Sequence, residues 1–144
     1  MRKTNADDTT TGTALANTTG LDFTLTANTS YTFEYFILFQ SAAANTGMGL
    51  AVNGPAAPTV VSYTIQTPQA ADANNAMFNG WGTYLDDPVQ AASVQTANTT
   101  YVARINGVIR TGASGGTLLP RFRSELNGTA VRVMTYSWGA LHTG

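Results

Sequence analysis

The sequence contains no cysteine. Disulfide bonds are therefore excluded, and so are the zinc sites that need cysteine thiolates. Charge is scarce as well, since charged residues make up 10% of the chain against roughly 25% in an average soluble domain. The formal net charge of −1 gives no reason to expect nucleic acid or an anionic membrane as a partner.

Long apolar runs are also missing. The stretch behind Met1 is polar, so we expect neither a signal peptide nor a membrane-spanning segment. From this we expect synthesis in the cytoplasm of the producing cell.

Patterns that carry chemistry are sparse. The single histidine, His142, lies near the end of the chain, where a catalytic base would be poorly held. Asp86–Asp87 precedes Pro88 and is typical of a turn, and the glycine-rich residues 112–116 lack the lysine and helix of a phosphate-binding loop. Nothing singles out Glu34 and Glu125 as a glycosidase pair. We therefore predict no enzymatic activity, no metal and no cofactor.

What the sequence does contain is apolar residues at period two. The clearest run covers residues 31–40, whose first face carries Tyr31, Phe33, Tyr35, Ile37 and Phe39. The other face holds Phe36 and Leu38. A strand that is apolar on both faces is buried on both, by a second sheet or by another subunit. This indicates subunit contacts at Phe36 and Leu38.

Further segments of this kind are separated by Asn, Gly and Pro. They predict strands at residues 13–16, 21–26, 31–40, 47–53, 59–66, 76–85, 101–111, 117–124 and 130–139. A loop is expected at 67–75, and no window supports a helix. The expected fold is an all-β jelly roll or sandwich of about eight antiparallel strands over residues 13–144. Residues 1–12 lack periodicity and predict a short, flexible, extended N-terminal arm.

One short block occurs twice. Residues 26–31 read Thr-Ala-Asn-Thr-Ser-Tyr, and residues 96–101 read Thr-Ala-Asn-Thr-Thr-Tyr. Two similar halves would suit a double Greek key, whereas a coincidence is the alternative in a sequence this rich in Thr and Asn.

Charge is divided unevenly along the chain. Residues 1–100 hold two basic and seven acidic side chains (net −5), and residues 101–144 hold five arginines and one glutamate (net +4). Arg104, Arg121 and Arg123 are candidates for pairing with the acidic part of a neighbouring subunit, because the guanidinium fork matches carboxylates. Pairing within one subunit, with Asp22, Glu34 or Glu125, remains open. Nucleic acid is a poor third possibility, since lysine clusters are missing.

Two aromatic residues suggest a different use. Trp81 and Tyr84 could stack on a sugar ring in a lectin-like or receptor-binding module. Packing in a core or an interface is the alternative for such side chains.

Several segments resemble a module of tailed-bacteriophage virion proteins. They are Arg2-Lys3-Thr4, Leu21-Asp22-Phe23, residues 27–34 (Ala-Asn-Thr-Ser-Tyr-Thr-Phe-Glu), residues 46–55, residues 103–112 and residues 119–125. The resemblance implies a β-sandwich that often trimerises, found in free-standing head proteins and in the C-terminal parts of tail fibres. It implies no catalytic residues.

The resemblance covers almost the whole chain and leaves no room for a fibre shaft, which favours a capsid decoration (cement) protein. We expect a homotrimer on the outer capsid surface of the virion, bound to the major capsid protein, with Arg2 and Lys3 reaching a neighbouring subunit. A tail-fibre or spike tip that binds a host receptor or glycan through Trp81 and Tyr84 is the alternative.

Overall fold

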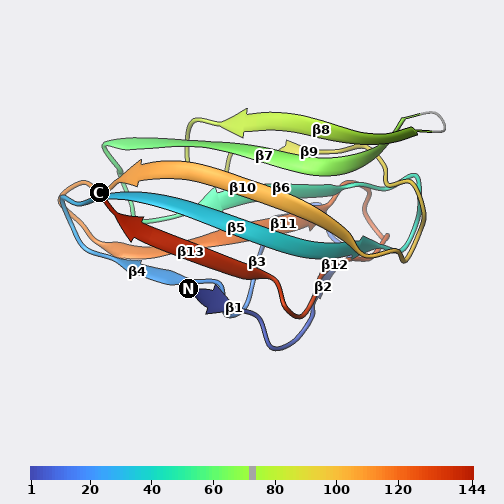
Figure 1. Cartoon of the computed structure of the whole chain (residues 1–144), viewed down its shortest axis with the longest axis horizontal. Helices are drawn as coiled ribbons and strands as arrows, with labels where there is room; N and C mark the ends of the chain where they lie inside the picture. Colours follow the sequence, from blue (N-terminus) through green and yellow to red (C-terminus); the bar gives the residue numbers. More distant parts are fainter. Residues whose placement is uncertain (72–73) are drawn as a thin grey trace.

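The computed structural model describes residues 1–71 and 74–144, and this part of the chain is all-β. Two antiparallel sheets, of eight and five strands, pack face to face as a β-sandwich (Figure 1). The described residues contain no helix, and thus none that could cross a membrane.

The large sheet is built around one long central strand, β5 (Ser30–Ser41). Its strand order is β1 (Arg2–Lys3), β13 (Trp138–Thr143), β5, β10 (Tyr101–Arg110), β7 (Val60–Ala71) and β8 (Asn74–Gly82). In addition, β12 (Val131–Val133) pairs with β5 and with β2 (Asp8–Thr10).

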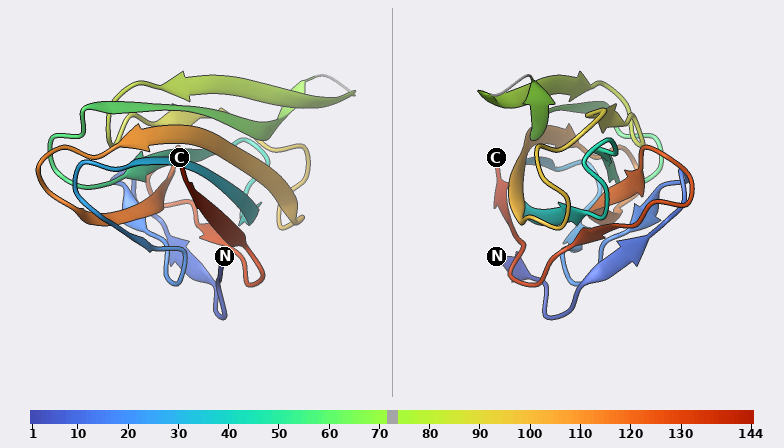
Figure 2. Two further views of the ribbon diagram at one scale, coloured as in Figure 1. Left: turned by 60° about the vertical axis from the view of Figure 1, so that its left-hand side comes forward. Right: turned by 90° about the vertical axis from the view of Figure 1, so that its right-hand side faces the viewer.

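The small sheet closes the other side of the sandwich. Its order is β3 (Ala16–Asn17), β11 (Gly116–Ser124), β6 (Met48–Asn53) and β9 (Val89–Gln90), with β4 (Phe23–Leu25) also on β11. In two views of the ribbon the β7–β8 hairpin extends along one rim of the molecule, and the N-terminal strands lie at the opposite rim (Figure 2).

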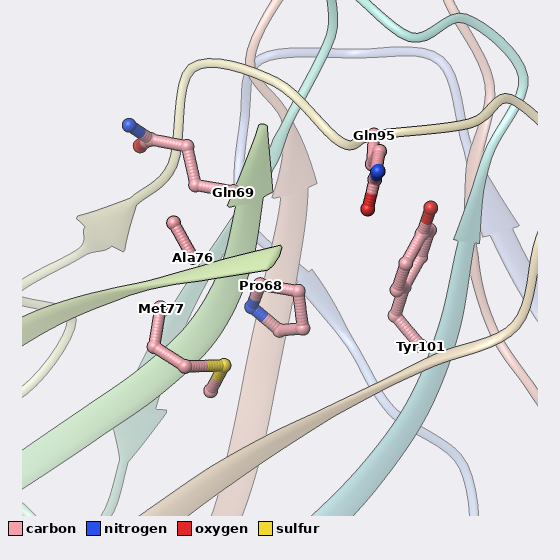
Figure 3. A pocket seen from close by; sticks show the side chains of 6 residues that line it. All are labelled: Pro68, Gln69, Ala76, Met77, Gln95 and Tyr101. Carbon is pink, nitrogen blue, oxygen red and sulfur yellow. The ribbon is translucent and has the colours of Figure 1, made fainter. Parts of the chain in front are cut away.

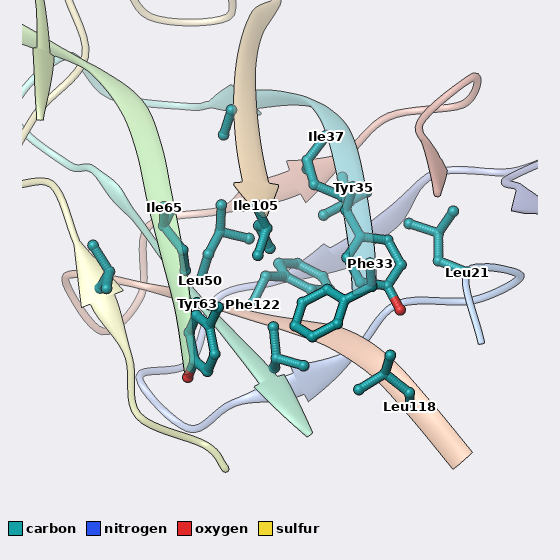
Figure 4. Packing of buried hydrophobic residues seen from close by; sticks show 14 of the residues in the cluster. Leu21, Phe33, Tyr35, Ile37, Leu50, Tyr63, Ile65, Ile105, Leu118 and Phe122 are labelled. Carbon is teal, nitrogen blue, oxygen red and sulfur yellow. The ribbon is translucent and has the colours of Figure 1, made fainter. Parts of the chain in front are cut away.

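The core lies between the two sheets (Figure 4). The predicted inward stripe of β5 is confirmed, because all five of its apolar side chains are buried. Their rings are accommodated by glycines on the paired strands. A Cβ on Gly107 would lie 2.5 Å from the Phe33 ring, and one on Gly139 would lie 2.5 Å from the Tyr35 ring. Glycine at these register positions leaves the space that the aromatic side chains fill.

The repeated block forms the same turn twice. Asn28 and Asn98 both adopt left-handed backbone, with φ of 55° and 56°. In each copy the tyrosine hydroxyl accepts a hydrogen bond from the amide of the threonine five residues earlier, at 3.0 Å for Tyr31 and 2.8 Å for Tyr101. The two turns lead into β5 and β10, which pair with each other along their length.

The loop expected at residues 67–75 was wrong where the structure describes it. β7 continues to Ala71 and β8 starts at Asn74, while residues 72–73 lie outside the described residues. Pro68 is tolerated because the pairing of β7 with β10 ends at Gln66, so β7 has only β8 as a sheet neighbour there.

The single strand expected at residues 130–139 was also wrong, because β12 and β13 are separated by a turn. Tyr136 has a positive φ of 73°, and the Ser137 amide donates to the Met134 carbonyl at 3.2 Å. The break is stabilised by the distant N-terminus, since the Asp7 carboxylate accepts from both the amide and the hydroxyl of Thr135.

The first twelve residues differ from the expected free arm. Arg2 and Lys3 pair with Gly139 and Trp138, and residues 8–10 pair with β12. Asp8 also accepts hydrogen bonds from the Thr19 amide and hydroxyl, at 2.6 and 2.8 Å. In the structure this segment is the edge of the large sheet.

Candidate functional site

The outer face of the large sheet carries an aromatic cluster. Trp138 and Arg104 flank Phe36 from the two neighbouring strands, because the register pairs each of them with Phe36. The rings of Phe36 and Trp138 stack with centroids 5.7 Å apart and planes at 11°, and the Arg104 guanidinium lies 5.4 Å from the Phe36 centroid. The three side chains form a continuous contact across three strands.

Leu38 extends this cluster along β5. It points to the same side as Phe36, is half-buried, and lies opposite the half-buried Val102 of β10. We call Phe36, Leu38, Arg104 and Trp138 the outer-face patch. The structure thus brings together three of the five residues that the sequence predicts for a subunit interface.

Two charged side chains at the outer-face patch can still form ion pairs with a partner. Glu34 and Arg104 line one hollow of about 180 Å³ with Asn106 and Trp138. Within the described residues the ion pairs are Arg121–Asp86 and Arg132–Asp7, so neither Glu34 nor Arg104 belongs to one. Both signs of charge are therefore available on the same face.

Trp138 was missed as a candidate, although the sequence held a signal for it. Buried Val131 and Val133 set the phase of the last predicted strand, and that phase points Trp138 outward. Four residues, 134–137, separate β12 from β13, so odd-numbered residues still point inward and even-numbered residues outward after the break. The stacking partner could not be read in this way, since it depends on the register against β5.

Arg121 and Arg123 lie elsewhere. Both project from the outer face of the small sheet, on the opposite side of β11 from the buried Phe122. Arg121 bonds Asp86 at 2.9 Å and the Leu15 carbonyl at 2.7 Å, and Arg123 donates to the Gln90 side-chain oxygen at 2.9 Å. These arginines are engaged within the chain, by partners other than the three acids considered from the sequence.

Arg2 and Lys3 are both exposed on the edge strand β1. The Lys3 ammonium lies 4.5 Å from the centroid of the Tyr136 ring. The residues predicted to reach a capsid subunit are thus presented from an ordered strand next to Trp138.

The two candidate sugar-binding aromatics are both exposed, Trp81 by 72% and Tyr84 by 60%, but they line separate grooves. Trp81 borders a groove of about 420 Å³ with Asn79, Pro88 and Gln90. Tyr84 borders another with Pro58 and Val60, and a hydrogen bond and the charge of Asp87 raise the pKa of its phenol.

A further hollow of about 260 Å³ lies between the β7–β8 hairpin and the start of β10 (Figure 3). Pro68, Met77 and Tyr101 are among the residues that line it. Among the described residues that line it, Tyr101 has the one titratable group, and that hydroxyl is bonded within its own turn.

Strong pKa shifts fall in the core. Burial raises the pKa of Tyr35, and it raises the pKa of Tyr63 to about 12. The Tyr63 hydroxyl donates to the Asp87 carbonyl at 2.7 Å. Among the described residues no three His, Asp or Glu side chains gather as a metal site would need.

Comparison with known proteins adds no relative to this picture. No family model, no curated protein sequence and no solved structure matches the chain.

Proposed function

We propose that this protein is a structural, non-enzymatic component of a virus particle, a capsid decoration protein that binds the outer surface of a tailed-phage head as a homotrimer. The outer-face patch is the observation that carries the proposal. The virion role comes from the sequence resemblance, and the patch supplies the contact that such a role requires.

The composition of the outer-face patch suits a protein contact. Aromatic residues and arginine are enriched where binding energy concentrates, and a stacked Phe–Trp pair is preorganised before the partner arrives. Arg104 and Glu34 can pair with the opposite charges of another copy, because neither is in an ion pair within the described chain. A second copy of the chain therefore satisfies both the apolar and the charged parts of this face.

We also propose that the sandwich is a jelly roll, and the strand pairing supports this. A jelly roll is a long antiparallel hairpin wrapped into two sheets. Its first strand therefore pairs with its last strand, its second with its second-to-last, and so on toward the middle of the chain. With the β7–β8 hairpin and the three-residue strands β2, β4 and β12 set aside, the pairs are β1–β13, β3–β11, β5–β10 and β6–β9. This nesting is the one that a jelly roll requires, and β7–β8 is then an addition to it.

The test of the proposal has two readouts. Light scattering should give three copies, or a multiple of three, for the wild type, whereas the double variant Phe36→Ser, Leu38→Ser should lose this three-fold association and stay folded. Leu126→Ser, which also removes an exposed leucine but lies in a distant turn, is the control and should associate like the wild type. A double variant that keeps the three-fold association would contradict the assignment of the interface.

The second readout addresses the virion role. Purified protein should bind phage heads that lack it, in a number close to a multiple of three per capsid site, and Arg2→Ala, Lys3→Ala should bind more weakly. Heads that take up no protein would contradict decoration.

One observation favours a second candidate function, the binding of a glycan at a fibre or spike tip. The groove beside Trp81 combines an exposed ring with the amide side chains of Asn79 and Gln90, and none of the described residues that line it is charged. On a glycan array, Trp81→Ala should lose the binding. Tyr84→Ala should keep it, because Tyr84 lines a different groove.

A further inference from the structure

Strand β8 ends the large sheet with an uncovered edge. It is nine residues long and has one sheet neighbour, β7. No other described backbone group bonds to residues 74–82. The rim position of β8 is visible in two views of the chain (Figures 1 and 2). One row of its amide and carbonyl groups is therefore open to pairing.

No described part of the chain pairs with this edge. β9 is the nearest strand of the small sheet, and it lies beneath β8 rather than beside it. The missing side chain of Gly80 makes room for Val89, since a Cβ there would lie 2.5 Å from a Val89 methyl group. The contact of β8 with β9 is thus a packing of faces and leaves the strand edge free.

The usual protection of an edge strand is missing as well. Natural edges carry charged side chains or proline, which discourage pairing with another chain. β8 contains neither, and the described residues of β7 contain no charge. The outward side chains of β8 include Met77 and Trp81, which are 51% and 72% exposed. This combination favours strand addition.

We propose that β8 pairs antiparallel with β8 of a second copy of this chain, about a two-fold axis at Asn79. A two-fold contact places the same residues opposite each other, so a charged edge would repel its copy and the uncharged β8 does not. With Asn79 opposite Asn79 of the second copy, each Met77 lies opposite the other copy's Trp81. Methionine sulfur and an aromatic ring form a favourable pair.

This contact is separate from the outer-face patch. β8 lies three strands away from β5, a distance of about 14 Å at the usual strand spacing. The inference does not rest on the proposed function, because the edge can pair whether or not the outer-face patch binds another copy.

A single engineered cysteine tests the pairing, since the natural chain has none. The two-fold axis brings Asn79→Cys next to its counterpart, so mild oxidation of the full chain should convert most of it to a cross-linked dimer. Gln66→Cys is the matched control, because Gln66 is the partner of Asn79 on β7, one strand inward on the same face. It should give at least tenfold less dimer. Equal yields from the two variants would overturn the proposal.

A charge test applies to the protein without oxidation. Asn79→Lys places two like charges opposite each other and should weaken the association by about fivefold or more in sedimentation, whereas Gln66→Lys should leave it unchanged. Both variants should keep the wild-type circular dichroism spectrum. The double variant Phe36→Ser, Leu38→Ser should cross-link through Asn79→Cys as before, so failure of the outer-face contact and failure of the edge contact are distinguishable. An Asn79→Lys variant that associates like the wild type would refute the edge contact.

Discussion

The two faces of β5 use the same residue types for different purposes. On the inner face, Phe33 and Tyr35 are buried against glycines of the neighbouring strands. On the outer face, Phe36 stacks on Trp138 beneath the exposed Arg104. The inner rings are enclosed by their own chain, whereas the outer ring still offers surface to a partner. Aromatic content alone therefore does not identify a contact site, and the deciding quantity is what lies opposite each ring.

The largest effect should come from removing one ring from each face in turn. Phe33→Ala leaves a cavity in a closed core and should lower the free energy of unfolding by about 3–5 kcal/mol. Phe36→Ala loses its cross-strand contacts with Trp138 and Arg104 and should cost about 1–2 kcal/mol. Urea unfolding of the two variants measures both values. Similar losses at the two positions would remove the distinction between the faces.

An alanine introduced on each face should sharpen the same comparison. Gly107→Ala places a Cβ 2.5 Å from the Phe33 ring and 2.7 Å from the Tyr63 Cβ, and we expect a loss of about 3 kcal/mol from overpacking. The adjacent Asn106→Ala points outward and should change stability by less than about 0.5 kcal/mol. The midpoints of thermal unfolding provide the measurement. If Gly107→Ala melts like the wild type, the inner face is not closely packed.

High pH should act on the inner face as well. The folded pKa of Tyr63 is about 12 against an unfolded value of 10.0, because burial disfavours the phenolate. The folded state therefore keeps the Tyr63 proton to a higher pH than the unfolded state does. The free energy of unfolding is unaffected by this group below pH 10 and decreases as the pH rises toward about 12. Tyr63 alone should remove about 2 kcal/mol by pH 12.

Urea unfolding across this pH range, read with tyrosine absorbance, should show the loss. Tyr63→Phe should reduce it, and Tyr136→Phe, at an exposed turn position, is the matched control. An identical alkaline profile for Tyr63→Phe and the wild type would show that another group controls unfolding at high pH.

Local pattern was sufficient for part of this picture. The alternation along residues 31–40 identified both the buried stripe and the outward Phe36 and Leu38, because period two is a property of the strand itself. The all-β sandwich followed from the same pattern. The repeated block held a real local structure, since both copies form the same turn.

What the sequence could not supply depends on partners far along the chain. Arg121 meets Asp86 only after the loop behind β8 has been folded against β11, so no local signal selected Asp86 over Glu125. Residues 67–71 have weak strand propensity, and they form a strand because β8 pairs with them. Residues 1–12 have no apolar periodicity either, and they are ordered because they pair with the distant strands β12 and β13.

The N-terminal edge should give the smallest effect, and it extends the comparison from the faces of the sheet to its rim. Hydrogen bonds from the amide and hydroxyl of Thr135 lower the pKa of Asp7 below its ordinary value of 3.8. The stabilisation is therefore present above pH 3.8 and is lost as the pH falls through the lower, folded value. Asp7→Asn should remove this dependence and loosen β1 and β2, at a cost within about 1 kcal/mol.

Amide exchange in residues 2–10 and at Thr135 should be faster in Asp7→Asn, while the amides of β5 and β10 should keep their protection. Asp22→Asn is the matched control, because Asp22 makes no ion pair among the described residues and, unlike Asp7, accepts no hydrogen bond from Thr135. If exchange rises throughout β5 as well, the N-terminal segment is part of the cooperative core. Arg2 and Lys3 would then be held in place by the whole sandwich, instead of by the two hydrogen bonds at Asp7.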